Sequence, residues 1–325
     1  MALLEVRNLS VGITRGNKYL YPVNGIDITI NAGEIVALAG ESGSGKTLTA
    51  LSIMRLLPPA AEVTGGSVRC NGNEDSAGIA MIFQESRQSL NPLMRVGPQI
   101  AEALELHGTD KKTAAESALD MLRTLKLPDP EKVFGAWPHQ LSGGMCQRVM
   151  IAIAAIRRPR LLIADEPSSS LDTENRSTIL DLLAQINREY GTAILFITHD
   201  LSVAVDFCSR LLVMYAGRII EEGPSQELFC APMHPYTAAL VGAIPRKENR
   251  GHPLASIPGT APSIEERLPG CPFAPRCLKA QSRCAVELPL LEDVGGGRCV
   301  RCFLPGREEE EESHTEARRH GGRGE

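Results

Sequence analysis

The stretch that most constrains the fold of this 325-residue chain is residues 40–47, which read Gly-Glu-Ser-Gly-Ser-Gly-Lys-Thr. They match every fixed position of the phosphate-binding loop pattern Gly-x4-Gly-Lys-Ser/Thr. The apolar run Glu34–Ala39 precedes this loop, and Lys46–Leu57 carries apolar side chains at helical spacing. A buried strand, a glycine loop and a helix are therefore predicted in that order, whereas a Gly/Ser turn without chemistry would require neither flanking element.

The composition of this loop suits it to bind phosphate groups. Glycines let successive backbone N–H groups converge on phosphate oxygens, and the start of the following helix adds positive potential. Lys46 is expected to reach the outer phosphates of a nucleotide, and the Thr47 hydroxyl to ligate Mg²⁺. The residues predicted to bind the phosphates are Gly40, Ser42, Gly43, Ser44, Gly45, Lys46 and Thr47.

A second element of a phosphate site follows the apolar strand predicted at Arg160–Ala164, which ends in Asp165 and Glu166. A carboxylate at the end of a buried strand beside the phosphate loop can hold Mg²⁺ through its water shell. A second carboxylate next to it can polarise an attacking water. Asp165 is therefore the predicted metal residue and Glu166 the predicted general base, and the alternative is an acidic strand cap without chemistry.

The overall charge argues against nucleic acid as a partner. The chain has 34 Lys and Arg against 39 Asp and Glu, a net charge of −5, so no global basic field is expected. Its start lacks the basic and apolar regions of a secretory signal, and its longest apolar run, Val149–Ile156, is too short to span a bilayer. A cytosolic or peripheral chain is expected, with any membrane role exerted through partners.

The order of the apolar runs predicts an α/β fold of the P-loop NTPase class. Short alternating runs over Leu3–Ile30, turning at Thr14–Lys18, predict antiparallel strands, and Gly65-Gly66 is expected to mark a turn before a short strand at Ser67–Cys70. From there strands alternate with helices, which indicates a mostly parallel sheet, with a helical insert at about 90–155.

Three segments are predicted along the chain. Residues 1–225 form a nucleotide-binding domain, because the strand and helix alternation stops beyond Gly223. Residues 226–306 are expected to be a Pro-rich linker and a small Cys-rich C-terminal extension. Residues 307–325 form a charged tail with almost no apolar side chain, which is expected to be disordered.

Residues Leu141–Arg148, Leu-Ser-Gly-Gly-Met-Cys-Gln-Arg, resemble the signature motif of ATP-binding cassette (ABC) ATPases. They lie between the phosphate loop and the Asp165-Glu166 pair, where that family places its signature. Gln84 is similar to the Q-loop glutamine, Ser-Leu-Asp at 170–172 to the D-loop, and His199 to the switch histidine. The resemblance covers about residues 3–225 and implies the ABC cassette fold and ATP hydrolysis.

The resemblance also implies a role for each of these residues. Ser142, Gly143 and Gly144, at a helix start, would face the γ-phosphate of ATP held by an opposite subunit, and Asp172 would lie at the same interface. Hydrolysis would then require a dimer closed over two ATP molecules.

Within one half-site, the implied catalytic residues are Glu166, His199 and Gln84. His199 would contact the γ-phosphate and orient the water, while Gln84 would sense Mg²⁺ and link the site to the helical insert. The implied Mg²⁺ residues are Thr47, Gln84 and Asp165.

A narrower resemblance, to ATPase subunits of dipeptide and oligopeptide importers, rests on further stretches. They are Phe83-Gln84 with residues 89–92, residues 139–148, His-Pro-Tyr-Thr at 234–237, Ile-Pro-Gly-Thr at 257–260, and Gly-Cys-Pro-Phe-Ala-Pro-Arg-Cys at 270–277. It implies a peripheral protein at the cytoplasmic face of the cell membrane, acting with two transmembrane permeases and a second ATPase subunit. The second ATPase is either an identical or a sister chain, and an extracytoplasmic solute-binding protein would deliver the peptide.

Other functions stay open at this stage. Relatives of these importers also move nickel or other small solutes. A soluble ABC ATPase acting on nucleic acid or the ribosome usually has coiled-coil insertions, tandem cassettes or basic segments, and this chain has none of them. A redox-sensing scaffold would not need Lys46, Asp165, Glu166 and His199 together.

Five of the nine cysteines crowd the C-terminal segment, and four of them follow the spacing C-x5-C-x6-C-x17-C: Cys271, Cys277, Cys284 and Cys302. Four thiolates can hold a [4Fe–4S] cluster or a tetrahedral Zn²⁺, and ligand chemistry alone leaves that choice open. The importer resemblance implies the iron–sulfur cluster, with Cys302 as fourth ligand and Cys299 as a substitute. Free cysteines in a loose tail are the alternative.

The chain departs from the family pattern at two places. The family usually stacks adenine on an aromatic residue near the turn of the first strand, but residues 11–13 are Val-Gly-Ile. Tyr19 or Tyr21 is the candidate substitute. The chain is also short between Gly72 and Ile79, which indicates a trimmed surface hairpin.

Overall fold

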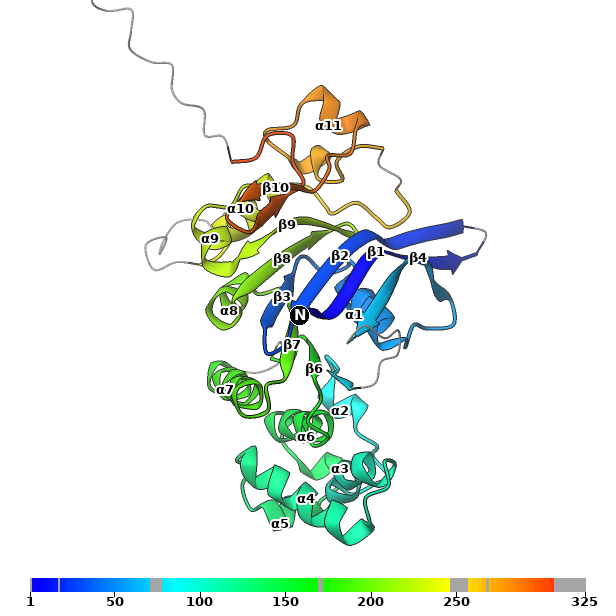
Figure 1. Ribbon diagram of the computed structural model, residues 1–325, viewed down its shortest axis with the longest axis vertical. Helices are drawn as coiled ribbons and strands as arrows, with labels where there is room; N and C mark the ends of the chain where they lie inside the picture. The colour runs from blue at the N-terminus through cyan, green and yellow to red at the C-terminus, as the bar shows by residue number, and fades with distance from the viewer. Residues whose placement is uncertain are drawn as a thin grey trace, which may run out of the picture.

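The computed structural model describes residues 2–16, 18–70, 78–168, 172–245, 257–266 and 269–306. Three predictions lie outside these residues: the trimmed hairpin after Gly72, the D-loop residues Ser170 and Leu171, and the charged tail. The molecule is elongated, with the helical insert at one end and the Cys-rich segment at the other (Figure 1).

The N-terminal strands form an antiparallel sheet in the order β2-β1-β4. Its members are β1 (Ala2–Arg15), β2 (Lys18–Asn31) and β4 (Ala61–Cys70). The predicted hairpin of β1 and β2 is present, with Val6 opposite Ile28. The strand predicted at Ser67–Cys70 is present as the end of β4, but β4 already begins at Ala61 and runs through both glycines, so the turn predicted at Gly65-Gly66 is wrong. Gly66 lies against the carbonyl oxygen of Arg7 at positive φ (+83°), so the pair forms an irregularity inside the strand, where the register shifts.

The main sheet has the strand order β10-β11-β9-β8-β3-β7-β6-β5. Strands β3, β5, β6, β7 and β8 run parallel, as predicted, and the others are antiparallel. Its members are β3 (Ile35–Ala39), β5 (Ile79–Ile82), β6 (Leu161–Asp165), β7 (Ala193–Thr198), β8 (Arg210–Tyr215), β9 (Arg218–Pro224), β10 (Glu292–Gly295) and β11 (Arg298–Val300). The parallel strands end at one edge, which therefore collects the residues that follow them.

Apolar side chains pack on both faces of the main sheet. In β7, Ile194 and Phe196 belong to the core beneath the helices, whereas Leu195 and Ile197 belong to the core shared with the antiparallel sheet. A strand buried on both faces reads as a continuous apolar run, which is why β7 was predictable from the sequence.

Helices cover the sheet and build the insert. They are α1 (Lys46–Met54), α2 (Ser86–Ser89), α3 (Val96–Glu105), α4 (Lys111–Thr124), α5 (Pro130–Gly135), α6 (Gly143–Ala155), α7 (Thr173–Tyr190) and α8 (Leu201–Phe207). A short 3₁₀ helix, η1 (Pro138–Gln140), precedes α6. The prediction that α1 continues to Leu57 is wrong. Arg55 adopts a left-handed conformation (φ 57°) and its N–H caps the carbonyls of Leu51 and Ser52, so the helix ends before the prolines.

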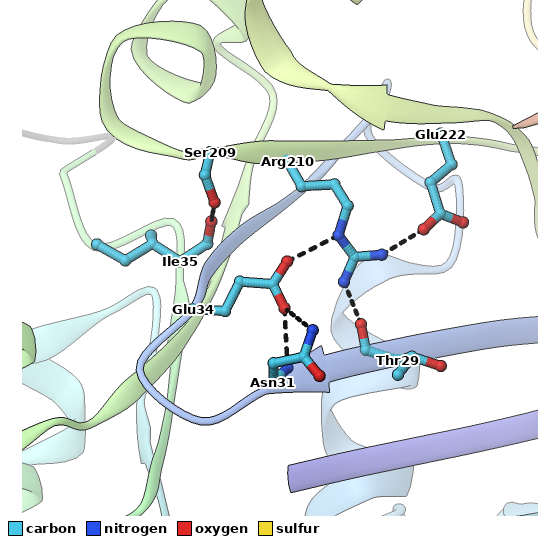
Figure 2. Close-up of polar contacts among 7 residues, drawn as sticks. All are labelled: Thr29, Asn31, Glu34, Ile35, Ser209, Arg210 and Glu222. Carbon is cyan, nitrogen blue, oxygen red and sulfur yellow. Dashed lines mark hydrogen bonds and ion pairs between the residues drawn. The ribbon is translucent and has the colours of Figure 1, made fainter. Parts of the chain in front are cut away.

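Arg210, the first residue of β8, joins the two sheets next to the strand that leads into the phosphate loop (Figure 2). Its Nε donates to Glu34 at 2.8 Å, and its two terminal nitrogens contact Glu222 of β9 and the carbonyl oxygen of Thr29 of β2. Glu34 also accepts the backbone N–H of Asn31 at 2.8 Å. The entry to β3 is thereby fixed against both sheets.

The first part of the segment predicted as a linker is helical. It contains α9 (Ser225–Cys230) and α10 (Pro235–Gly242). The prolines misled the prediction, because Pro235 occupies the first turn of α10, where its missing N–H costs nothing. Tyr236 beside it is fully buried in the main core.

The Cys-rich segment is attached to the edge of the main sheet. It comprises the 3₁₀ helix η3 (Ala274–Arg276), α11 (Ser282–Val286), β10 and β11. Val300 of β11 pairs with Glu221 of β9, which extends the sheet by the C-terminal hairpin. In the described part of the chain, no helix is both long and apolar enough to cross a membrane.

Candidate active site

The phosphate loop connects β3 to α1 and packs so closely that two of its glycines have no room for a side chain. A Cβ on Gly40 would lie 2.1 Å from the carbonyl oxygen of Met214. A Cβ on Gly45 would lie 2.6 Å from the carbonyl oxygen of Pro22, and Gly45 has φ +108°. Only glycine tolerates both the contact and the dihedral angle, so these positions set the path of the loop.

The ammonium group of Lys46 is buried inside this loop. Its Nζ donates to the carbonyl oxygen of Gly40 at 2.8 Å and to that of Glu41 at 2.9 Å. Burial lowers the pKa of Lys46, and the nearby carboxylates of Glu166 and Asp165 oppose that shift. The loop therefore holds a poorly solvated cation whose hydrogen bonds go to backbone oxygens, an arrangement that a bound anion would improve.

Asp165, at the end of β6, has the features of a metal ligand. The residue is 2 % exposed, burial raises the pKa of its carboxyl, and the Thr47 hydroxyl is its hydrogen-bond partner. Among the described residues, Asp165 Oδ1 and Ser44 Oγ are buried without a hydrogen-bond partner. Buried oxygens of this kind normally have a partner, so the pair points to a ligand. Carboxylate and hydroxyl oxygens are the donors that Mg²⁺ prefers, and Asp165 with Thr47 fits it.

Glu166 lies between two other predicted catalytic residues. Its Oε1 is 3.0 Å from Nδ1 of His199, and its Oε2 accepts from Nε2 of Gln84 at 3.2 Å. Its backbone has φ 48°, an unfavourable conformation for any residue other than glycine. Its N–H donates to the carbonyl oxygen of Ile197 at 2.9 Å. The bond to Ile197, together with Gln84 and His199, holds this strained residue so that its carboxylate lies at the phosphate site.

Most of these residues line one open cavity of about 550 Å³, but Gly40, Asp165 and His199 do not. The predicted site residues that line it are Ser42, Gly43, Ser44, Gly45, Lys46, Thr47, Gln84 and Glu166. Residues 261–264, from the segment that precedes the Cys-rich region, also line this cavity. The structure thus gathers the phosphate loop, the base candidate and a stretch that sequence reasoning did not associate with the site.

The signature residues stand apart from this cavity. Ser142 caps α6 by accepting the N–H of Met145 at 3.3 Å, and Ser142 and Gly143 are exposed. Asp172 caps α7 by accepting the N–H of Asn175 at 2.8 Å. A Cβ on Gly144 would lie 3.0 Å from Oδ1 of Asn175, so the two helix starts adjoin each other. They form an exposed, N–H-rich surface separate from their own chain's phosphate loop.

Tyr19 and Tyr21 line a second cavity of about 280 Å³, which shares Gly43 and Ile264 with the first. The Tyr19 ring covers Gly12, where a Cβ would lie 2.3 Å from it. Its hydroxyl donates to Glu62 at 2.8 Å, and this bond raises the pKa of Tyr19 to about 12. The Tyr21 ring meets the Tyr19 ring edge to face at 5.3 Å. The two tyrosines thus stand beside the nucleotide cavity, over the strand that lacks the expected aromatic residue.

Four cysteines of the C-terminal segment, Cys271, Cys277, Cys284 and Cys302, line one small apolar cavity. The N–H of Cys271 donates to the carbonyl oxygen of Cys284 at 2.8 Å, which draws their loops together. Burial raises the pKa of Cys271 to about 11. Cys299 does not line this cavity; it lies in β11 opposite Glu222.

The cavity holds about 20 Å³, so an occupant larger than a water requires its walls to move apart. Within the described residues, no group of three or more His, Cys, Asp or Glu side chains is arranged to hold a metal ion. The donor set nevertheless suits a thiophilic centre, because four thiols surround an apolar space.

Sequence reasoning missed the residues that support the phosphate loop from outside. The N–H of Glu41 donates to the hydroxyl of Tyr236 at 2.9 Å, and the Glu41 carboxylate binds Arg276. These partners lie 195 and 235 residues away in the chain. No local pattern could have connected them.

Comparisons with known proteins agree with this geometry. Residues 23–169 match the family model described as "ABC transporter", and residues 220–284 match "Oligopeptide/dipeptide transporter, C-terminal region". The oligopeptide transport ATP-binding protein OppD of Haemophilus influenzae is 42 % identical over 315 residues, covering 93 % of this chain and 97 % of its own. The OppD protein of Salmonella typhimurium is 43 % identical over 316 residues, covering 93 % and 94 %.

Solved structures of ATP-binding cassettes share the fold. The cassette MJ0796, solved as a dimer in a post-hydrolysis state with ADP and Pi, aligns with a TM-score of 0.61 at 26 % identity, covering 68 % of this chain and 98 % of its own. CbiO1 from Clostridium perfringens, part of an ABC transporter complex, aligns with a TM-score of 0.61 at 24 % identity, covering 70 % and 91 %. The predicted ABC cassette fold is confirmed.

Proposed function

Because the chain belongs to the family of ATP-binding proteins of oligopeptide ABC transporters, we propose that it binds and hydrolyses Mg-ATP to power peptide import through membrane permeases. The observation that carries this proposal is the grouping of Lys46, Thr47 and Glu166 around one cavity, with Glu166 held by Gln84 and His199. Such a site can bind a triphosphate, hold its Mg²⁺ and activate a water in line with the γ-phosphate.

The position of the signature residues supports a dimeric active form. Ser142 and Gly143 are exposed and Gly144 is half-buried, at a helix start away from their own phosphate loop, so in the proposed mechanism they complete the site of a second ATPase chain. Asp172, which adjoins them through Asn175, would lie in the same interface. The partner is an identical or a sister subunit, and the two ATP sites of the dimer close at the same time.

The remaining assignments follow from the family. The chain would sit at the cytoplasmic face of the membrane, with residues 1–225 as the ATPase domain and the helical insert against two permeases. A solute-binding protein would present peptide on the other side, and nickel or another small solute is the alternative cargo. Leu93, in the insert, is 86 % exposed and suits contact with a permease.

We propose that the base of ATP rests against Tyr21, which is 45 % exposed and lines the same cavity as Gly43. The Tyr19 ring supports Tyr21 from the side and is itself fixed by Glu62. An aromatic face from β2 would thereby replace the one missing from β1.

We also propose a [4Fe–4S] cluster on Cys271, Cys277, Cys284 and Cys302. In such a cluster each thiolate binds a different iron, so the sulfurs lie farther apart than the ligands of one Zn²⁺. The proposal is supported by the four thiols, which line one cavity. Cys299, which lies outside the cavity, is not proposed as a ligand.

The cysteine proposal predicts that anaerobically purified protein is brown, with broad absorbance near 400 nm (roughly the range of thiolate-to-iron charge transfer) and iron and sulfide in equal amounts. Cys302→Ser should remove the colour, whereas Cys299→Ser should leave it unchanged. A colourless protein that contains zinc would show that the four thiols bind Zn²⁺ and not a cluster. A protein with neither metal would leave the thiols free.

The importer proposal is tested by affinity capture of the tagged chain from native membranes, followed by mass spectrometry. Two polytopic permeases and a second ATPase are expected to copurify. The Leu93→Asp variant should no longer copurify with the permeases, because the interface would then have to bury a charge in place of an apolar side chain. Leu278→Asp is the matched control, since Leu278 is 95 % exposed but lies in the Cys-rich segment. Recovery of ribosomal or DNA-bound proteins alone would contradict transport.

A further inference from the structure

Glu41, the second residue of the phosphate loop, is bound by an arginine from the C-terminal segment. Nη1 of Arg276 donates to Oε2 of Glu41 at 2.8 Å, and Nη2 donates to Oε1 at 3.1 Å. The side chain of Arg276 is 6 % exposed and that of Glu41 27 %. A two-bond contact with this little exposure is a stronger and more directional interaction than a surface ion pair.

The guanidinium group of Arg276 is itself fixed by its surroundings. Nη1 also donates to the Tyr215 hydroxyl at 3.2 Å, and Nε donates to the carbonyl oxygen of Pro258 at 2.8 Å. The group lies 5.9 Å from the ring centroids of Tyr215 and Phe273. Because β8 and the C-terminal segment both hold it, Arg276 can act as a rigid support for Glu41.

Glu41 is part of the nucleotide cavity as well as of this support. Its carbonyl oxygen accepts Nζ of Lys46 at 2.9 Å, and its N–H donates to the hydroxyl of Tyr236. The residue also lines the cavity with the rest of the loop. The start of the phosphate loop is thus held at its backbone by α10 and at its side chain by the Cys-rich segment.

A carboxylate in a loop that binds a polyanion needs compensation. An unpaired charge at Glu41 would repel the phosphates, because charges a few ångströms apart interact strongly where water is scarce. It could also turn into the cavity and compete for the Lys46 ammonium. Arg276 prevents both effects by neutralising the carboxylate and holding it with two hydrogen bonds.

We propose that Arg276 is a positioning residue of the ATP site, which sets the affinity for Mg-ATP by pairing with Glu41. The C-terminal segment is then required for the nucleotide site of its own chain. This inference rests on the proposed function, since it names a further determinant of the same site. Arg276 does not touch the reacting atoms and acts only through the phosphate loop.

The test is the dissociation constant of Mg-ATP, measured by calorimetry on the full chain, together with kcat and KM of its ATPase activity. Arg276→Met should weaken binding and raise KM by roughly tenfold, with kcat changed less than about twofold, because one unpaired carboxylate then faces the phosphates. Adding Glu41→Gln to Arg276→Met should restore most of the lost affinity. Arg276→Lys should fall between the wild type and Arg276→Met, because it keeps the charge but not the two-bond geometry.

Arg283→Met is the matched control. Arg283 belongs to the same segment and lies over the Phe303 ring, but its side chain is 51 % exposed and pairs with Glu287. It should leave Mg-ATP affinity unchanged. Melting temperatures without nucleotide show whether each variant folds.

Two outcomes would overturn the inference: unchanged affinity in folded Arg276→Met, or failure of Glu41→Gln to restore it. The second would mean that Arg276 has a structural role only. If the wild type bound Mg-ATP but did not hydrolyse it, the proposed function would fail. The Mg-ATP affinities of the wild type and the Arg276 variants would still show whether Arg276 positions Glu41.

Discussion

Glu166→Gln is expected to lower kcat by about 10²- to 10⁴-fold while Mg-ATP still binds, because glutamine keeps the shape of the side chain but cannot accept a proton. The amide can also keep one hydrogen bond to Gln84 or His199, the two groups that flank the carboxylate at 3.2 and 3.0 Å. Binding without turnover should trap the ATP-bound dimer. The measurements are phosphate release, and the dimer fraction by size-exclusion chromatography in Mg-ATP.

Glu85→Gln provides the control for this substitution. Glu85 directly follows Gln84, is exposed and does not line the nucleotide cavity. Its amide variant should hydrolyse ATP at the wild-type rate. Near-normal turnover in Glu166→Gln would show that Glu166 is not the general base, and His199 would be the next residue to test.

The strained backbone of Glu166 adds a reason to use glutamine for this test. Its φ of 48° is disfavoured for any residue with a Cβ, and the bond from its N–H to Ile197 helps to hold it. Glycine would relieve the strain and free the loop, so a loss of activity in Glu166→Gly would mix two causes. Glutamine changes only the capacity to take a proton.

The parts of the site that follow single strands were predictable from the sequence. Asp165 ends β6, His199 directly follows β7, and Gln84 lies two residues beyond β5. Because parallel strands end at one edge, short motifs were sufficient to place these residues together near the phosphate loop. The confirmed cassette fold rests on the same apolar runs. The structure of such a motif can be predicted from the local sequence, because the loop and its flanking elements are contiguous in the chain.

Other features depended on contacts that no local pattern encodes. Arg55 ends α1 by a left-handed turn, although arginine is an ordinary helix former. Gly66 sits inside β4 because it must approach the backbone of Arg7 and Asn8, while as a sequence signal it indicates a turn. The pair of Glu41 and Arg276 joins residues 235 positions apart, and neither residue type singles out the other. Tertiary contacts decided the positions of Gly66 and of the Glu41–Arg276 pair, whereas Arg55 ends α1 through local bonds to Leu51 and Ser52.

Lys46→Ala is expected to weaken Mg-ATP binding by roughly 100-fold or more, because it removes a buried charged donor from the phosphates. Turnover at moderate ATP should be lost with it. Lys111→Ala is the control, since Lys111 is an exposed residue at the start of α4 in the insert. Calorimetric titration with Mg-ATP measures the affinity, and melting without nucleotide shows whether the variant is folded.

The buried setting of Lys46 also fixes the sign of a pH effect. Burial lowers its pKa in the free chain, and phosphate charges favour the ammonium form, so its pKa should rise when ATP binds. Binding then takes up a proton at pH values between the free and the bound pKa. Affinity should be full below the free pKa and fall as the pH rises through it. Titrations in buffers of different ionisation enthalpy measure this proton uptake, which Lys46→Ala should abolish. An unaltered proton uptake in Lys46→Ala would assign it to another group.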